Sequence, residues 1–179
     1  MNVPNCLTIL RILLVPVFVV FMLADLFGAY DKYMAAILFI AASLTDLLDG
    51  YLARKNNQVT VFGKFMDPLA DKLLVCSAMI CLVELGMLPC WIVIIIVGRE
   101  FIISGFRLVA AERGIVIAAS YWGKFKTVSQ MIMVVLLVFD FGGVFDTISQ
   151  VFIYLSLILT IISLGDYIHK NRIVLQDVH

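Results

Sequence analysis

Four aspartates at helical spacing form the part of the chain best suited to chemistry. Asp46 and Asp49 lie three residues apart, and Asp67 and Asp71 lie four apart. Because residues three or four apart share one face of a helix, each pair presents two carboxylates in one direction. A short turn between the two helices would make them antiparallel neighbours and let both pairs converge. Four oxygen donors without a nearby histidine or thiolate favour Mg²⁺ or Mn²⁺ over zinc, and two such ions would offset the repulsion between the carboxylates.

Small residues and one arginine accompany the aspartates. Gly50 and Ala53 leave room beside the carboxylates for a ligand or a neighbouring backbone, and Gly63 does the same before the second pair. Arg54 can bind a phosphate through two parallel hydrogen bonds. A single aspartate could instead cap a helix or pair with a nearby lysine, and Gly50 alone could be a packing glycine at a helix crossing. The eight positions together favour a metal site that handles a phosphate ligand.

The remainder of the chain has the composition of membrane-spanning helices. Its 179 residues are 63% apolar, and the mean hydropathy is +1.08. Charged residues inside apolar segments of this kind are costly, which supports a functional role for the aspartates. Six apolar runs approach the roughly 20 residues that a bilayer core requires: 7–28, 33–54, 61–86, 90–111, 122–141 and 147–168. These runs are too long for barrel strands, so we predict an all-α fold, a polytopic membrane protein with six transmembrane helices in a single domain over residues 1–179.

The distribution of charge predicts the orientation of these helices. Lysine and arginine gather at one set of helix ends, whereas the opposite ends hold Lys32 together with acidic residues: Asp25, Asp31, Glu84, Asp140 and Asp146. The excess of positive charge predicts that both termini and the aspartate motif are cytoplasmic. The net charge of zero gives no reason to expect a nucleic-acid partner. The four cysteines form no CxxC pair and are expected to be packing residues.

The pattern D-x2-D-G-x2-A-R-x8-G-x3-D-x3-D, which runs from Asp46 to Asp71, resembles the signature of the CDP-alcohol phosphatidyltransferase family at all eight positions. The resemblance implies an integral membrane enzyme, usually a homodimer, in which an alcohol acceptor displaces CMP from a CDP-linked lipid or alcohol. It implies two divalent cations, Mg²⁺ or Mn²⁺, held by Asp46, Asp49, Asp67 and Asp71, with Asp71 also taking the proton of the acceptor hydroxyl. The residues expected to contact the CDP-lipid are Asn5, Thr8, Asp49, Gly50, Ala53, Arg54 and Gly63.

Three further segments resemble those of bacterial phosphatidylglycerophosphate synthases, a branch of this family. They are the PN-x-LT-x2-R opening at residues 4–11, the RE-F-x2-S-x2-R segment at residues 99–107 and the GK-x-KT segment at residues 123–127. This likeness implies that CDP-diacylglycerol is the donor and glycerol 3-phosphate the acceptor, with phosphatidylglycerophosphate and CMP as products. It also implies a bacterial cytoplasmic membrane location with the active site on the cytoplasmic side.

Basic residues of the fourth and fifth spans are candidates for binding the acceptor phosphate. Arg99 and Arg107 lie eight residues apart, on roughly the same helix face, whereas Lys124 and Lys126 diverge if helical. Glu100 is expected to point away from Arg99. These cations could instead set the topology or touch anionic lipid. Likewise, Asn5 and Thr8 could contact a ligand at the entrance of the site or only cap the first helix.

Two other functions remain open on the sequence. The first is an enzyme of the same family with a different acceptor, such as inositol phosphate, serine or a second phosphatidylglycerol. The second, from a different class, is a divalent-cation channel or transporter built on the same carboxylates. A transporter would need polar residues along a path across the bilayer, whereas the charge here gathers at one side.

Overall fold

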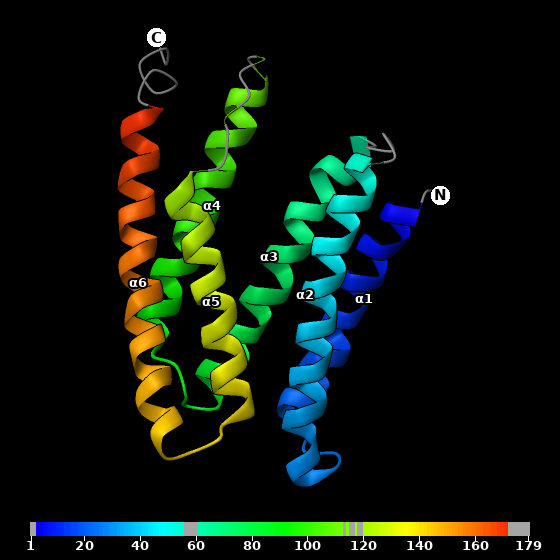
Figure 1. Cartoon of the computed structure of the whole chain (residues 1–179), viewed down its shortest axis with the longest axis vertical. Coiled ribbons are helices and arrows are strands. Elements are labelled where there is room, and N and C mark those ends of the chain that lie inside the picture. The colour runs from blue at the N-terminus through cyan, green and yellow to red at the C-terminus, as the bar shows by residue number, and fades with distance from the viewer. Residues whose placement is uncertain (1–2, 56–60, 113, 115–116, 118–119, 172–179) are drawn as a thin grey trace. The chain divides into compact units, whose positions relative to one another are not determined.

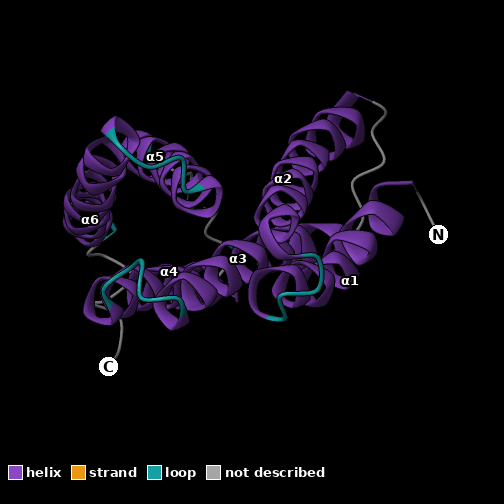
Figure 2. Ribbon diagram, turned by 90° about the horizontal axis from the view of Figure 1, so that it is seen from below, coloured by secondary structure: helices purple, strands orange, loops and turns teal. Residues whose placement is uncertain are grey.

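The computed structural model describes residues 3–55, 61–112, 114, 117 and 120–171, and the side chains of residues 3–5, 46–55, 61–65 and 67 fall outside that description. The described chain is helical, and Figure 2 shows helices joined by loops, without a strand in this part of the chain. Figure 1 labels its six α-helices: α1 (Val3–Leu23), α2 (Asp31–Lys55), α3 (Val61–Glu84), α4 (Cys90–Glu112), α5 (Tyr121–Phe139) and α6 (Val144–Lys170). The prediction of an all-α fold is confirmed, with six α-helices in the described residues, and that all six cross a membrane stays a prediction.

The largest difference from the predicted boundaries lies at the end of α1, which stops at Leu23 although the apolar run continues to residue 28. Asp25 adopts a left-handed backbone conformation with φ of 43°, which an α-helix does not allow. The N–H of Phe27 then donates a hydrogen bond of 2.8 Å to the carboxylate of Asp31, and a short 3₁₀-helix, η1 (Gly28–Tyr30), leads into α2. The helix therefore ends where the local backbone conformation and hydrogen bonds change, although the apolar residues continue beyond that point.

The helices divide into two compact units, which are described separately. Unit 1 comprises Met1–Met87 and Val134–Phe141, and unit 2 comprises Leu88–Met133 and Gly142–His179. The division falls within α5, whose last residues belong to unit 1. The single domain over residues 1–179 stays a prediction.

In unit 1, α1 packs against both α2 and α3 (Figure 1). The buried positions of α2 and α3 include many alanines, among them Ala35, Ala42 and Ala78. The aromatic rings of Phe18 on α1 and Phe39 on α2 lie with their centroids 6.0 Å apart. Small residues let helix backbones approach closely. In lipid, where the hydrophobic effect does not drive helices together, this close van der Waals contact stabilises their association.

In unit 2, α4 packs against α6, and the buried face of α6 is largely polar. Ser156 and Ser163, with Thr160 between them, lie on one face because their spacings alternate between four and three residues. The hydroxyl of Ser156 also lies 2.9 Å from that of Ser129 on α5, which ties α5 to α6. This line of buried hydroxyl groups on α6 is called the hydroxyl stripe below.

Large apolar side chains cover the outside of every α-helix. Leu13 of α1 is 62% exposed, Ile94 of α4 is 64% exposed and Phe101 of α4 is 70% exposed. A surface of this composition is typical of helices that face lipid. Within the described chain, three helical segments are long and apolar enough to cross a membrane: Cys6–Leu23, Tyr121–Phe139 and Val144–Lys170. All four cysteines are free thiols: Cys81 is buried and Cys76 half-buried, as expected of packing residues, whereas Cys6 and Cys90 are exposed.

Candidate active site

The four signature aspartates lie on two consecutive helices of unit 1. Asp46 and Asp49 belong to the last third of α2, and Asp67 and Asp71 belong to the first half of α3. Figure 1 shows α2 and α3 running in opposite directions, and the two helices contact each other. The backbone therefore carries both pairs toward the same end of unit 1, which is the arrangement that the spacing predicts.

The side chains at this end are described only in part. Asp71 is half-buried and takes part in a polar interaction, whereas the other predicted metal ligands lie outside the described side chains. Among the described side chains, no three histidine, cysteine or acidic residues form a metal-binding group. The predicted CDP-lipid contacts that also lie outside them are Asn5, Asp49, Gly50, Ala53, Arg54 and Gly63. As a donor set, four carboxylates on two contacting helices fit a hard divalent cation, which prefers oxygen ligands.

Two residues of α1 are buried in the same unit. Thr8 is 2% exposed, so it is enclosed by protein, and Arg11 is also 2% exposed. Arg11 lies in the helix that packs against both aspartate-bearing helices, and a buried guanidinium requires a negative partner. From the sequence, Arg11 is one of the basic residues at the helix ends and the last residue of the PN-x-LT-x2-R segment, with no binding role assigned. The signal that identifies it is an arginine inside an apolar run.

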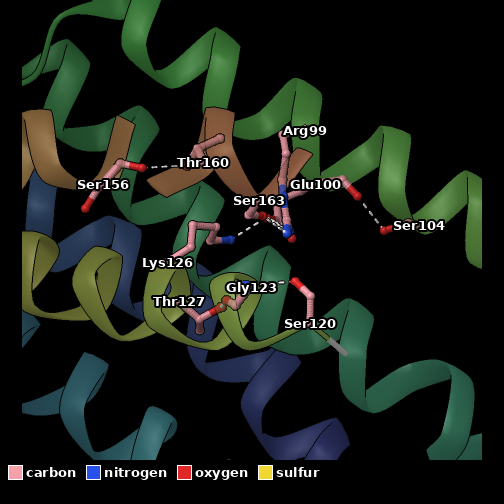
Figure 3. A network of polar contacts seen from close by, with 10 residues as sticks. All are labelled: Arg99, Glu100, Ser104, Ser120, Gly123, Lys126, Thr127, Ser156, Thr160 and Ser163. Atoms are coloured by element: carbon pink, nitrogen blue, oxygen red, sulfur yellow. Dashed lines mark hydrogen bonds and ion pairs between the residues drawn. The ribbon is translucent and has the colours of Figure 1, made fainter. Parts of the chain in front are cut away.

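Unit 2 holds a buried ionic network that joins three helices (Figure 3). The carboxylate of Glu100 accepts a hydrogen bond of 2.8 Å from Nη1 of Arg99 and another from Nζ of Lys126 on α5. The other terminal nitrogen of Arg99 donates to the hydroxyl of Ser163 on α6. Arg99 is 8% exposed, Glu100 13% and Lys126 3%, so all three charges are shielded from solvent.

The expectation that Glu100 points away from Arg99 is wrong. Adjacent residues on a helix start in directions about 100° apart, but a glutamate side chain is long enough to turn back alongside its neighbour. Two buried cations without a carboxylate would carry a large desolvation penalty, which the shared Glu100 carboxylate offsets. Among the described residues, two cations of the network, Arg99 and Lys126, share one carboxylate.

The start of α5 is built to leave room for the Arg99 guanidinium. Ser120 precedes the helix, and its hydroxyl accepts a hydrogen bond of 3.1 Å from the N–H of Gly123, which is a typical N-cap. A Cβ added at Gly123 would lie 3.4 Å from Nη2 of Arg99 and 3.4 Å from the Ser120 hydroxyl. The glycine of the GK-x-KT segment therefore lies directly against the guanidinium.

The four basic residues predicted to bind the acceptor phosphate separate into two kinds. Arg99 and Lys126 are buried in the network, whereas Arg107 and Lys124 are exposed. Lys124 lies over the ring of Tyr121, 5.5 Å from its centroid. Lys124 and Lys126 do diverge, as their spacing on a helix predicts.

Sequence reasoning missed Glu100 and Ser163 as members of this group. The sequence predicts that Glu100 points away from Arg99, and it predicts no functional residue in the sixth span. The signal that identifies Ser163 is its place in the hydroxyl stripe, since serine and threonine on one face of an apolar helix mark the face that meets protein.

Comparison with known proteins places this arrangement in a family. Residues 1–162 match the CDP-alcohol phosphatidyltransferase family. The CDP-diacylglycerol–glycerol-3-phosphate 3-phosphatidyltransferase of Bacillus subtilis is 44% identical over 183 residues, covering 95% of each chain. The protein of the same name from Haemophilus influenzae is 39% identical, covering 98% of this chain and 96% of its own. A probable phosphatidylglycerophosphate synthase of Mycobacterium tuberculosis is also 39% identical, covering 99% of this chain and 83% of its own. With this match over most of its length, the chain belongs to the CDP-alcohol phosphatidyltransferase family.

Proposed function

We propose that the protein transfers the phosphatidyl group of CDP-diacylglycerol to glycerol 3-phosphate, forming phosphatidylglycerophosphate and releasing CMP. The observation that carries the proposal is the 44% identity to the Bacillus subtilis relative of that name across 95% of both chains. The order of the aspartate signature and the two basic segments along the chain adds to it.

In the proposed reaction, the primary hydroxyl of the acceptor attacks the phosphorus that carries the lipid. A new P–O bond forms, the bond to the CMP phosphate breaks, and Asp71 takes the hydroxyl proton. Two divalent cations, Mg²⁺ or Mn²⁺, would be held by Asp46, Asp49, Asp67 and Asp71 and would offset the charge of the pyrophosphate. The supporting observation is the placement of the two aspartate pairs on the contacting, antiparallel helices α2 and α3.

The CDP-lipid would lie against the small residues and the arginine of the signature. Gly50, Ala53 and Gly63 leave space for the nucleotide, and Arg54 would bind one of its phosphates. On α1, Asn5 and Thr8 supply polar groups, and the burial of Thr8 shows that this helix face is covered by protein.

The phosphate of glycerol 3-phosphate would bind to the basic residues of unit 2. In the described residues, the network of Arg99, Glu100 and Lys126 holds two cations on one carboxylate and is shielded from solvent. A cation attracts a phosphate more strongly in such a place than at a surface exposed to water. Glu100 fixes the two cations in position, and the exposed Arg107 and Lys124 add further positive charge.

We place the protein in the bacterial cytoplasmic membrane as a six-span homodimer with both termini and the active site on the cytoplasmic side. Support comes from the six long helices, from the apolar side chains on their outer faces and from the gathering of lysine and arginine at one set of helix ends. A membrane location suits a reaction between a lipid donor and a soluble acceptor.

Another acceptor with a phosphate group is the second candidate, because the cations of the network do not distinguish glycerol 3-phosphate from an inositol phosphate. Purified protein with CDP-diacylglycerol and Mg²⁺ would be assayed for CMP release with glycerol 3-phosphate, inositol phosphate, serine or phosphatidylglycerol. We expect release with glycerol 3-phosphate alone. Release with another acceptor alone would overturn the substrate assignment, and release with none, from folded protein, would overturn the enzymatic proposal in favour of a transporter.

A further inference from the structure

Ser163 joins the ionic network of unit 2 from α6, a helix to which the proposed reaction assigns no residue. Its hydroxyl accepts a hydrogen bond from Nη2 of Arg99 (Figure 3). Ser163 is 0% exposed, so its side chain is enclosed by protein. A hydroxyl in this position does not reach a substrate, and it can affect the reaction only through the guanidinium that it contacts.

The guanidinium of Arg99 is contacted by residues of three helices. Glu100, its neighbour on α4, accepts a hydrogen bond of 2.8 Å from Nη1. On α5, the backbone of Gly123 lies against Nη2, since a Cβ added there would come to 3.4 Å from that nitrogen. Ser163 of α6 accepts from the same nitrogen. The arginine therefore has one partner that supplies charge and two contacts that restrict where its head lies.

Glu100 and Ser163 restrict the arginine to different degrees. Glu100 has a long side chain on the same helix as Arg99, so the ion pair can persist while both side chains turn. Ser163 has a single side-chain torsion, and its hydroxyl is therefore fixed closely by the backbone of its helix. Because α6 packs against α4, the hydrogen bond to Ser163 sets the direction of the guanidinium relative to the helix bundle of unit 2.

The direction of a guanidinium matters for binding a phosphate. Each terminal nitrogen of an arginine carries two N–H groups, and the bonds to Glu100 and Ser163 use one on each nitrogen. A phosphate accepts two parallel N–H groups from an arginine in one plane. Hydrogen bonds weaken steeply when the N–H turns away from its acceptor. A residue that sets the direction of Arg99 therefore affects the affinity for a phosphate bound by that arginine.

We propose that Ser163 is a positioning residue for the acceptor: it holds the Arg99 guanidinium in the orientation that binds the phosphate of glycerol 3-phosphate. The inference rests on the proposed function, in which Arg99 binds that phosphate. It distinguishes two members of the hydroxyl stripe. Ser156 lies 2.9 Å from the hydroxyl of Ser129 and joins α5 to α6, whereas Ser163 bonds a residue of the acceptor site.

The test is steady-state kinetics of CMP release by the full-length protein in detergent, with CDP-diacylglycerol, Mg²⁺ and glycerol 3-phosphate. We expect Ser163→Ala to raise the KM for glycerol 3-phosphate about 10-fold, the order that one hydrogen bond to a charged group contributes. The kcat and the KM for CDP-diacylglycerol should stay at their wild-type values. Ser156→Ala is the matched control, because it removes another buried hydroxyl from the same face of α6, away from Arg99. It should leave both KM values unchanged.

A double-mutant cycle separates positioning from a general loss of structure. Arg99→Met removes the guanidinium and leaves Glu100 paired with Lys126. In that background, Ser163→Ala should change kcat/KM for glycerol 3-phosphate by less than about 2-fold, because the hydroxyl has no guanidinium to hold. If Ser163→Ala does not fold, Ser163→Cys takes its place, since a thiol is of similar size but only a weak acceptor. The same rise in KM is expected.

Three results would overturn the role of Ser163. They are an unchanged KM for glycerol 3-phosphate in the folded Ser163→Ala or Ser163→Cys variant, an equal rise in Ser156→Ala, and an undiminished effect of Ser163→Ala in the Arg99→Met background. Each of them leaves the turnover of the wild-type protein, and so the proposed function, intact. Wild-type protein that releases no CMP with glycerol 3-phosphate would instead overturn the proposed function, and the role of Ser163 with it.

Discussion

Nη1 of Arg99 lies 2.8 Å from Oε1 of Glu100, so two residues adjacent in the sequence form an ion pair inside unit 2. The same carboxylate oxygen accepts from Lys126 of the next helix. Glu100 is thus the only carboxylate among the described members of a network that holds two cations (Figure 3). Its removal would take away the counter-charge that the described residues supply to both cations.

We therefore expect Glu100→Gln to lower the free energy of unfolding by about 3 kcal/mol, the order found when one partner of a buried ion pair is lost. The measurement is thermal or denaturant-induced unfolding of the purified protein in detergent. The control is Lys170→Met, which breaks the pair between Lys170 and Asp166, 2.7 Å apart. Lys170 is 61% exposed, so that variant should change stability by less than about 1 kcal/mol. Equal effects of the two variants would contradict the assignment of a buried network.

The close approach of Gly123 to Arg99 predicts a dependence on side-chain size. Gly123→Ala places a Cβ at ordinary contact distance, 3.4 Å from Nη2, and removes a flexible residue from the first turn of α5. We expect it to retain activity, whereas Gly123→Leu should displace the guanidinium and raise the KM for glycerol 3-phosphate. The measurement is the KM for glycerol 3-phosphate of the two variants, from steady-state kinetics. A leucine variant with wild-type KM would show that the position of Arg99 is not needed for acceptor binding.

Arg107 offers a test of acceptor binding that leaves the fold intact, because its side chain is exposed. We expect Arg107→Ala to raise the KM for glycerol 3-phosphate about 10-fold with little change in kcat, as loss of one charge-assisted contact to a phosphate implies. Arg107→Lys should restore part of the affinity. Glu112→Gln, an exposed charge change on the same helix, serves as the control. An unchanged KM in Arg107→Ala would assign this arginine to lipid contact or topology instead.

The carboxylate set predicts a requirement for divalent cations. Chelation with EDTA should abolish CMP release, and excess Mg²⁺ or Mn²⁺ should restore it. Asp67→Asn should lower kcat by at least about 100-fold at any Mg²⁺ concentration. Glu84→Gln removes an exposed carboxylate from the end of the same helix and should leave kcat unchanged. Full activity in EDTA would contradict the proposed metal site.

Patterns within single helices were predictable from the sequence. The spacing of Asp46 and Asp49, and of Asp67 and Asp71, places each pair on a helix, and the structure has those helices. The six apolar runs correspond to six helices. In lipid, a single apolar segment of this length can pair all of its backbone N–H and C=O groups only by forming a helix. The two-residue spacing of Lys124 and Lys126 also predicted their divergence.

Contacts between side chains of different helices were harder to predict. The pairing of Glu100 with both Arg99 and Lys126 depends on side-chain conformations and on the reach of Lys126 from α5 to α4, which no periodicity encodes. The role of Ser163 depends in the same way on the packing of α6 against α4. The end of α1 is followed by the left-handed backbone of Asp25 and by the hydrogen bond from Phe27 to Asp31, neither of which hydropathy detects.

Several hydroxyl groups donate a hydrogen bond to a backbone carbonyl of their own helix, four residues earlier in the chain. Thr160 donates to the carbonyl of Ser156 at 2.6 Å, and Thr127 donates to that of Gly123 at 3.1 Å. Thr45 bonds the carbonyl of Ala41 at 2.7 Å in the same manner. Because donor and acceptor belong to the same helical turn, the bond forms before any neighbouring helix arrives. During biosynthesis, a newly made helix can thus pass from the insertion machinery into lipid with these hydroxyls already satisfied, and the bundle can assemble afterwards.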